Sequence, residues 1–454
     1  MAKVIRAVEV VGWLAIVRNP LARKLLGSAE NYPSRGGPFY EFQVRFNPLH
    51  RHTLAAGKRS VPVALSLTAF MRPLSAFKRR ALLAFSPLAA RLFALVVLST
   101  VWGCATAPAV PYTLDTSPLA FLPAAGAGID DQRGRFREIL CAVDEAHGHE
   151  LPEYRPCDQI LHRFSDEPPG TGRPVHLGPA RAKLRVAVVA GLGAECFARL
   201  VSAFRFALEH VQGFGYQTAS IRVDGLSSST NNGRQVKDAV VAMDLAPEER
   251  LVLIGYSKGT PDILEGLVTY PELAQRVTAV VSVAGSINGS PLADDASASM
   301  LGLLEYLPGS QCDEGDGGAL DSLKPSIRRD FASTHELPKT VQYYSLATFA
   351  RREQISFGLR GSYDDLATID PRNDSQMLFY DQIIIGGALL GFVNADHWAV
   401  ALPISRQRPG LAATLVNRNE FPREILLEAI VRHVEEQLSC CVTTAEAAKL
   451  TESP

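Results

Sequence analysis

The sequence has almost no net charge and lacks the short-range motifs of metal and nucleotide sites. Its 46 Lys and Arg residues nearly balance 47 Asp and Glu residues, giving a formal charge of −1 over 454 residues. Without an excess of positive charge, the composition gives no support to nucleic-acid binding. No His-x-x-x-His or Cys-x-x-Cys spacing indicates a metal site. The segment that starts at Gly191-Leu192-Gly193 does not complete Gly-x-Gly-x-x-Gly, because position 196 is cysteine. We therefore expect neither a metal nor a cofactor.

Cysteine is also scarce, and no internal repeat is visible. Seven cysteines in 454 residues are too few for a small scaffold held together by disulfides. The hydrophobic fraction of 47% is instead enough to build a large soluble core.

Acidic residues are nearly absent from the first 100 or so positions, which are rich in Arg, Lys and His. Within them, a basic segment that starts at Met71 leads into an apolar run, residues 92–102, and then to Gly103 and Cys104. This order is typical of an export signal, and the run is short for a membrane span. The "VWGC" stretch resembles the lipobox of bacterial lipoproteins, which implies acylation of Cys104. An uncleaved or differently cleaved export segment, a retained anchor helix and a cytosolic chain are the alternatives.

This interpretation divides the chain. A signal that begins at Met71 is complete in itself, so we expect residues 1–70 to be an upstream extension from a misplaced start codon, or disordered. Residues 71–103 are then the signal peptide, 104–130 an Ala/Pro-rich tether, 131–440 a globular domain with an insertion at 287–339, and 441–454 a tail. The predicted location is the bacterial cell envelope, lipid-anchored to the outer membrane on its periplasmic side, or outside the cell.

Export would place the remaining cysteines in an oxidising compartment. Cys141 with Cys157, and Cys196 with Cys312, are reasonable disulfide pairs, although buried free thiols remain the alternative. The adjacent Cys440 and Cys441 cannot bridge each other without strain.

From Leu184 onward, short apolar runs alternate with amphipathic stretches. Near-continuous Val, Ile and Leu between helices is the pattern of parallel strands covered on both faces, so we predict an α/β fold with a mostly parallel sheet. The predicted strands are 184–191, 216–225, 250–257, 277–285, 340–350 and 389–396, and the predicted helices are 196–211, 234–245, 260–273 and 422–438.

The segment Gly255-Tyr256-Ser257-Lys258-Gly259 fits the pattern Gly-x-Ser-x-Gly. Chance could supply this spacing, but here a predicted strand ends at the serine and a predicted helix follows it. That context is what a nucleophile elbow requires, because the serine must sit on a tight turn with glycines that let strand and helix pack closely.

With these features the chain resembles the α/β-hydrolase superfamily, and within it the bacterial secreted lipases and esterases. The resemblance covers residues 180–440 and rests on the elbow, a glycine-containing loop after an upstream strand, and late acid and histidine segments in the order Ser, Asp, His. It implies an α/β-hydrolase fold with helices on both faces of the sheet and a lid-like insertion. It also implies a serine hydrolase of small-molecule or lipid carboxylic esters. The apolar stretch 299–308 is compatible with a lid or with simple packing.

A serine hydroxyl needs a base to take its proton, and His335, His397 and His433 follow Ser257. His433 lies on the last predicted helix, which favours a surface or packing role, and His335 falls in the insertion. His397 follows a strand end, where this fold places its base, so it is the predicted base.

The base in turn needs a carboxylate to orient it. Asn373-Asp374-Ser375 resembles the Asn-Asp-Gly stretch of bacterial lipases, so Asp374 is the predicted acid. Asp381 and Asp370 are the alternatives. Asp396 adjoins His397, and neighbouring side chains rarely point at each other.

Acyl transfer also needs two donors for the oxyanion. The resemblance implies the amide of Lys258, after the nucleophile, and the amide of Leu192 in the loop after the first predicted strand. We expect the Lys258 side chain to be solvated, with contact to an acidic group of the substrate as the alternative. The loop 224–236 follows a predicted strand at the same edge, and its Ser and Asn residues are expected mainly to cap the next helix.

Two other functions remain open at this stage. An acyltransferase or thioesterase would use the same three residues and the same acyl-enzyme, so sequence does not separate it from an esterase. A non-catalytic envelope lipoprotein could keep the fold as a binding module.

Overall fold

The computed structural model describes residues 128–198, 200–295, 315–416 and 419–451. The predicted upstream extension, the signal peptide with Cys104, nearly all of the tether, the apolar stretch 299–308 and Cys312 lie outside the described residues.

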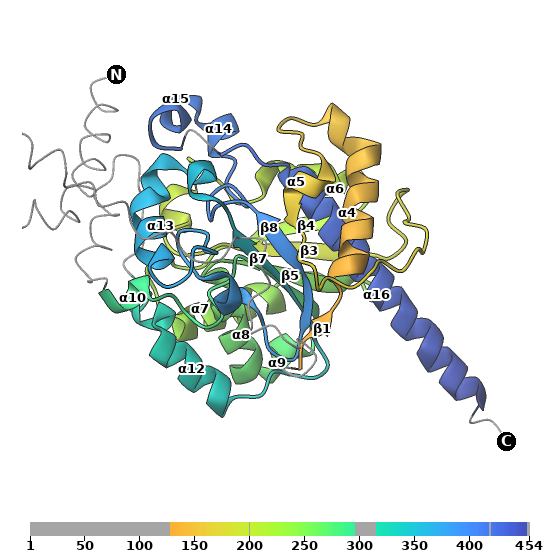
Figure 1. The fold of residues 1–454 in the computed structure, drawn as a ribbon. Helices are drawn as coiled ribbons and strands as arrows, with labels where there is room; N and C mark the ends of the chain where they lie inside the picture. Colours follow the sequence, from red (N-terminus) through yellow and green to blue (C-terminus); the bar gives the residue numbers. More distant parts are fainter. Residues whose placement is uncertain (1–127, 199, 296–314, 417–418, 452–454) are drawn as a thin grey trace, which may run out of the picture. The chain divides into compact units, whose positions relative to one another are not determined.

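An eight-stranded sheet forms the centre of the described part of the chain (Figure 1). Its order is β1-β8-β7-β6-β5-β3-β4, all parallel, and β2 pairs antiparallel with β8. The strands are β1 Asp130–Asp131, β2 Leu161–His162, β3 Leu184–Val189, β4 Gln217–Ile221, β5 Arg250–Tyr256, β6 Val277–Val283, β7 Gln342–Phe349 and β8 Ala388–Asn394. The predicted α/β fold with a mostly parallel sheet is confirmed.

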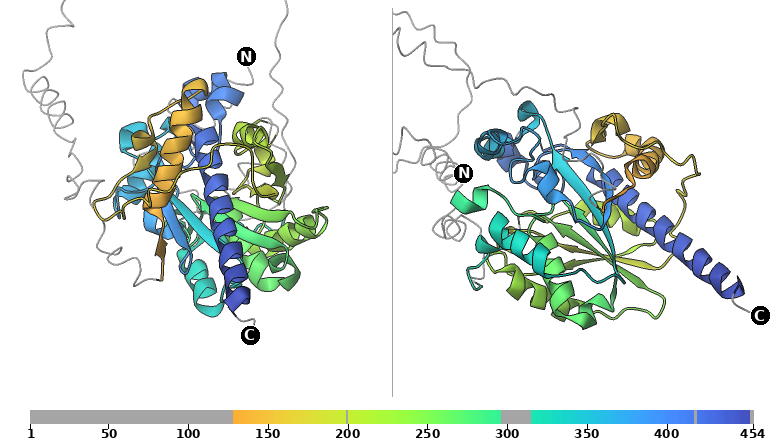
Figure 2. Two further views of the ribbon diagram at one scale, coloured as in Figure 1. Left: turned by 90° about the vertical axis from the view of Figure 1, so that its right-hand side faces the viewer. Right: turned by 60° about the horizontal axis from the view of Figure 1, so that its bottom comes forward.

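Helices cover both faces of this sheet (Figures 1 and 2). On one face, α4 Arg133–His147, α6 Arg205–Gln212 and α16 Arg423–Thr451 bury apolar side chains against the strands in one large core cluster. On the other face, a second cluster joins the strands to α7 Ser229–Val241, α8 Gly259–Thr269, α9 Pro271–Ala274 and α12 Pro325–Thr334. Burial on both faces explains why the central strands are apolar without alternation.

Several element boundaries differ from the prediction. The helix predicted at 196–211 is wrong in its first half: a 3₁₀ helix, Glu195–Phe197, is followed by irregular chain before α6. Phe204 holds a left-handed conformation (φ 54°) and donates its N–H to the Ala401 carbonyl, 2.8 Å away, so no helix runs through this position.

Two other helices differ at their ends. α7 begins at Ser229 rather than 234, because the Ser228 hydroxyl accepts a hydrogen bond from the Asn231 N–H at 3.1 Å and caps the helix. The stretch 260–273 forms α8 and α9 instead of one helix, with the break at Tyr270 before Pro271.

Shorter helices complete the described chain. They are α5 Cys157–Ile160, α10 Leu292–Asp295, α13 Arg360–Ala367, α14 Ile404–Gln407 and α15 Pro409–Leu411, with 3₁₀ helices at Gly148–Glu150, Asp321–Leu323, Arg352–Gln354, Phe357–Leu359 and Phe379–Gln382, and a π-helix at Ala412–Val416. Among the helices of the described residues, none combines the length and the apolar character needed to cross a membrane.

Candidate active site

Ser257 lies at the turn between β5 and α8. Its φ of 58° is left-handed, a strained conformation for a residue with a Cβ. The side chain is almost buried, with 8% of the residue exposed. The predicted elbow is therefore present as a local geometry: strand, strained serine, helix.

The two glycines of the elbow are required by close packing. A Cβ at Gly255 would lie 2.5 Å from the Thr260 Oγ1, and a Cβ at Gly259 would lie 2.1 Å from the Val189 carbonyl oxygen. Only glycine fits at these positions, because α8 leaves the turn directly against β3 and β5.

His397 follows the end of β8 and faces the elbow. Its Nε2 lies 2.9 Å from the Ser257 Oγ. Two hydrogen bonds hold its backbone: the Tyr256 hydroxyl donates to the His397 carbonyl at 2.7 Å, and the His397 N–H donates to the Asp374 carbonyl at 2.9 Å. These contacts fix the imidazole next to the serine hydroxyl.

Asp374 lies on the far side of the same imidazole. Its Oδ2 is 2.8 Å from the His397 Nδ1 and accepts a second hydrogen bond from the Thr348 hydroxyl at 2.6 Å. Its Oδ1 accepts from the backbone N–H groups of Gln376 and Met377, at 2.9 and 2.8 Å. The carboxylate is fully buried, and these four contacts satisfy it and fix its direction.

Ser375, which stands where the resemblance led us to expect glycine, also holds a left-handed conformation. Its φ is 82°, and its N–H donates to the Asn373 Oδ1 at 2.9 Å. The turn that orients Asp374 therefore has the geometry for which glycine is the favourable residue.

Two other carboxylates considered for the acid have other partners. Asp370 forms an ion pair with Arg372 at 2.9 Å. Asp396, whose pKa is raised by burial, accepts hydrogen bonds from the backbone N–H groups of Ser356 and Ala399. Of the three carboxylates, it is Asp374 that the structure places within hydrogen-bond distance of the His397 Nδ1.

The other two histidines are likewise separate from the elbow. His433, on α16, is buried against Phe136 and Tyr344, so of the two roles expected for it, surface or packing, it has the packing role. His335 is exposed at the end of α12 and stacks on Phe331.

The loop after β3 lies directly against the elbow. A Cβ at Gly191 would be 2.8 Å from the Ser257 Oγ, so the backbone of this loop touches the serine. The backbone N–H groups of Leu192 and Lys258 make no hydrogen bond to another residue in the part of the chain that the structure describes. Two unpaired amides, one in that loop and one directly after Ser257, are what an oxyanion needs.

The Lys258 side chain contradicts the prediction of a solvated group. Only 1% of the residue is exposed, and its Nζ forms an ion pair with Asp262 at 2.6 Å. Asn232 on α7 donates to the other Asp262 oxygen at 2.9 Å. A buried ammonium requires such a partner, so the side chain anchors the start of α8 instead of facing solvent.

Sequence reasoning did not find three of these supporting residues. Asp262 had a usable signal, because it stands four residues after Lys258 on a predicted helix. Thr348 and Tyr256 had none, since their hydroxyls reach Asp374 and the His397 backbone only in the folded chain, from β7 and from the end of β5.

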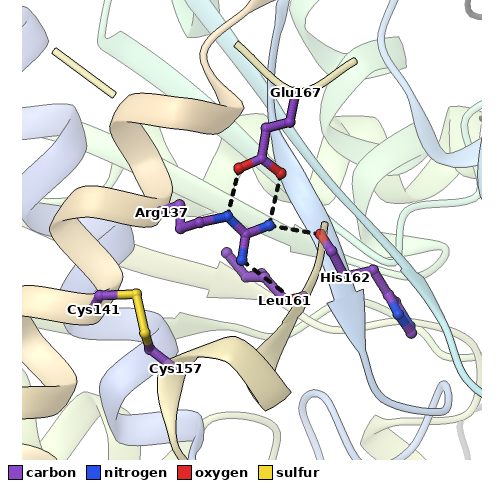
Figure 3. The surroundings of a disulfide bond; sticks show 6 residues. All are labelled: Arg137, Cys141, Cys157, Leu161, His162 and Glu167. Carbon is purple, nitrogen blue, oxygen red and sulfur yellow. Dashed lines mark hydrogen bonds and ion pairs between the residues drawn. A yellow bond between two sulfur atoms is a disulfide. The ribbon is translucent and has the colours of Figure 1, made fainter. Parts of the chain in front are cut away.

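A disulfide between Cys141 and Cys157 joins α4 to α5 (Figure 3). This bond is one of the two predicted pairings. Beside it, the Arg137 guanidinium binds the Glu167 carboxylate and the His162 carbonyl. Cys196 is also disulfide-bonded, and Cys312, its predicted partner, lies outside the described residues.

Comparison with solved structures gives a close relative. A carboxyl esterase of metagenomic origin is 46% identical to this chain, with a TM-score of 0.67, over 71% of this chain and 97% of the esterase. A lipase from Bacillus licheniformis in its mature form is 22% identical over 50% of this chain and 89% of the lipase, with a TM-score of 0.40. EstA from Clostridium botulinum is 12% identical over 65% of this chain and 98% of its own, with a TM-score of 0.42. Neither a scan against protein-family models nor a search of curated proteins gave a match.

Proposed function

Because this chain belongs to the family of carboxyl esterases with the α/β-hydrolase fold, we propose that Ser257, His397 and Asp374 are the catalytic triad with which it hydrolyses carboxylic esters. The observation that carries the proposal is the hydrogen-bonded series from the Ser257 Oγ through His397 to Asp374, at 2.9 and 2.8 Å.

The reaction proceeds in two steps. The Ser257 Oγ attacks the ester carbonyl while the His397 Nε2 accepts its proton, and the imidazolium then protonates the departing alcohol. Water, deprotonated by the same nitrogen, attacks the resulting acyl-enzyme; the acid leaves, and the imidazolium returns the proton to the Ser257 Oγ.

Asp374 sets the tautomer of the base. Because its Oδ2 accepts from the His397 Nδ1, the Nε2 carries a free lone pair toward Ser257. The Thr348 hydroxyl and two backbone amides occupy the rest of the carboxylate, so it cannot turn away from the ring.

The backbone amides of Leu192 and Lys258 would bind the oxyanion of the tetrahedral intermediate. Each such donor contributes about 3 kcal/mol to the stability of the transition state. The buried ion pair between Lys258 and Asp262 supports this role, because it fixes the backbone that carries one of the two amides.

Hydrolysis of p-nitrophenyl esters of graded chain length tests the proposal and ranks acyl lengths. The Ser257→Ala variant should lose at least about 10⁴-fold in kcat/KM, whereas Ser333→Ala, an exposed serine on α12, should keep full activity. A fluorophosphonate probe should label Ser257 in the folded protein. Unchanged activity in Ser257→Ala would overturn the assignment. Adding an alcohol and measuring how the acyl-enzyme partitions would separate a hydrolase from an acyltransferase.

We also propose that the protein is exported and acylated on Cys104. The Cys141–Cys157 disulfide supports export, because such bonds persist in oxidising compartments. In a bacterial host, metabolic labelling with an alkyne fatty acid should mark the wild-type chain and not Cys104→Ser. Equal labelling of both would exclude Cys104 as the acylated residue.

A further inference from the structure

Figure 1 shows α4, α6 and α16, which cover one face of the sheet. Three side chains of a kind that binds metals in other proteins come together from these helices. His147 ends α4, His210 lies on α6 and Glu428 on α16. One nitrogen of each imidazole and one oxygen of the carboxylate all lie within 4.8 Å of one another. None of the three belongs to the proposed catalytic site.

The contacts are already close to those of a coordination sphere. The His147 Nδ1 lies 3.0 Å from the Glu428 carboxylate, and the His210 Nε2 lies 2.7 Å from it. Around a tetrahedral zinc ion with bonds of about 2.0–2.1 Å, the ligand atoms are about 3.4 Å apart. An ion would therefore need each ligand to move by less than about 1 Å.

Glu428 is a preformed anionic ligand. Its side chain is fully buried. The Arg432 Nε donates to its Oε1 at 2.7 Å. Partners of this kind orient a metal-binding carboxylate in the manner of outer-shell groups.

The same arginine limits the affinity. Its guanidinium is itself held by the carbonyl oxygens of His176, Leu177 and Gly178, so it stays beside Glu428 and opposes a second positive charge. The side chains of His147 and His210 are 25% and 15% exposed, so an ion can approach from solvent.

We propose that His147, His210 and Glu428 form a binding site for a borderline divalent cation of the zinc type. Two imidazole nitrogens and one carboxylate are ligands that zinc prefers, with water as the fourth, whereas calcium and magnesium prefer oxygen alone. Such an ion would link three helices that lie far apart in the sequence. His210 and Glu428 are 218 residues apart, which is why no local spacing revealed the site.

Calorimetric titration of the chelator-treated, tag-free full chain with zinc chloride tests this. We expect one zinc ion per chain with a Kd of about 1–10 µM, and a melting temperature raised by about 5 °C at zinc a hundredfold above Kd. Absence of saturable binding below about 100 µM zinc would overturn the proposal.

Histidine variants identify which residues bind the zinc ion. His147→Gln and His210→Ala should each weaken zinc binding at least tenfold, whereas His149→Ala, an exposed histidine two residues after His147, should bind zinc as the wild type does. Zinc binding that is unaffected in both His147→Gln and His210→Ala would place the ion elsewhere and reject the proposal.

Zinc X-ray absorption of the loaded wild-type chain gives a test that does not depend on how the variants fold. Two imidazole nitrogens and further light ligands at about 2.0–2.1 Å are expected. A sulfur shell at about 2.3 Å would show that cysteines bind the ion, and would overturn the assignment.

Discussion

Two serines at the proposed active site hold backbone conformations that cost free energy. Ser257, at φ 58°, must be a serine if it is the nucleophile, and the turn projects its hydroxyl toward His397. Ser375, at φ 82°, has no such requirement, because the turn uses its backbone and not its side chain. Its hydroxyl is buried and makes no hydrogen bond with any described residue. Strain at Ser257 is thus part of the proposed mechanism, whereas strain at Ser375 is dispensable.

We therefore expect Ser375→Gly to stabilise the protein by about 1 kcal/mol. A left-handed conformation costs an L-residue about 1–2 kcal/mol, and the greater freedom of glycine in the unfolded chain offsets part of the gain. Urea unfolding measures the free energy, and ester hydrolysis should stay unchanged because Asp374 keeps its contacts.

Ser375→Ala is the matched control, because it removes the buried hydroxyl and keeps the Cβ that is strained in this conformation. It should gain less stability than the glycine variant. Equal gains would assign the effect to the hydroxyl instead of the backbone.

For single residues, the sequence predicted the order of the site residues along the chain but not the side chains that pack around them. Ser257, Asp374 and His397 could be predicted because the fold brings the carboxyl ends of particular strands together. The buried Lys258 could not, because its burial depends on how α7 packs on α8 and supplies Asn232 beside Asp262.

Among the elements, the strands were easier to predict than the helices. Runs such as β5, buried on both faces, carry a continuous apolar signal. The stretch 196–211 has a helical pattern of apolar residues, yet its first half belongs to the connection between β3 and α6. Just before this stretch, the Gly225 N–H donates to the Glu195 carboxylate and the Gly193 N–H donates to the Gly225 carbonyl. Within it, the left-handed Phe204 donates its N–H to the Ala401 carbonyl, and such tertiary contacts override helix propensity.

The junction of β5 with α8 tolerates little added volume. In Gly259→Ala, the new Cβ would lie 2.1 Å from the Val189 carbonyl oxygen. Backbone of β3 must then move, so we expect a loss of at least about 2 kcal/mol of stability and a drop in kcat, because the elbow moves with it. Thermal unfolding and ester hydrolysis measure the two effects.

Gly361 in α13 provides the comparison. A Cβ there would meet nothing within 4 Å, and alanine is the better helix former by about 1 kcal/mol. Gly361→Ala should therefore be neutral or stabilising and fully active. If both alanine variants behaved alike, steric contact at Gly259 would not be the cause.

The whole molecule buries ionisable groups on both faces of its sheet, and most are compensated by partners. Lys258 has Asp262, and Glu428 has Arg432. Asp381, in the 3₁₀ helix Phe379–Gln382, has no such compensation: burial raises its pKa to about 7, and Arg329 and Asn288 lower it only in part. We therefore expect the free energy of unfolding to depend on the titration of Asp381.

The sign follows from proton counts in the two states. The usual pKa of 3.8 applies to Asp381 in the unfolded chain, and about 7 applies in the folded one. Between these values the folded chain binds one proton more, so the Asp381 contribution to the free energy of unfolding decreases as pH rises from about 4 to 7 and is level above 7. The side chain is partly exposed, so we expect about 2 kcal/mol in total, below what the full shift implies.

Asp381→Asn removes this dependence while keeping the shape of the side chain. At pH 8.5 the variant should be about 2 kcal/mol more stable than the wild type, because the wild type must keep a charge buried. At pH 4.5 the difference should fall to about 1 kcal/mol, because the wild-type carboxyl is then mostly protonated in the folded chain but still mostly ionised in the unfolded one. Urea unfolding at both pH values measures the difference, and Asp365→Asn, an exposed position on α13, shows the effect of the substitution alone.

A difference between Asp381→Asn and wild type that is the same at pH 4.5 and 8.5 would mean that Asp381 does not titrate in this range. The pH dependence would then have to come from other carboxylates.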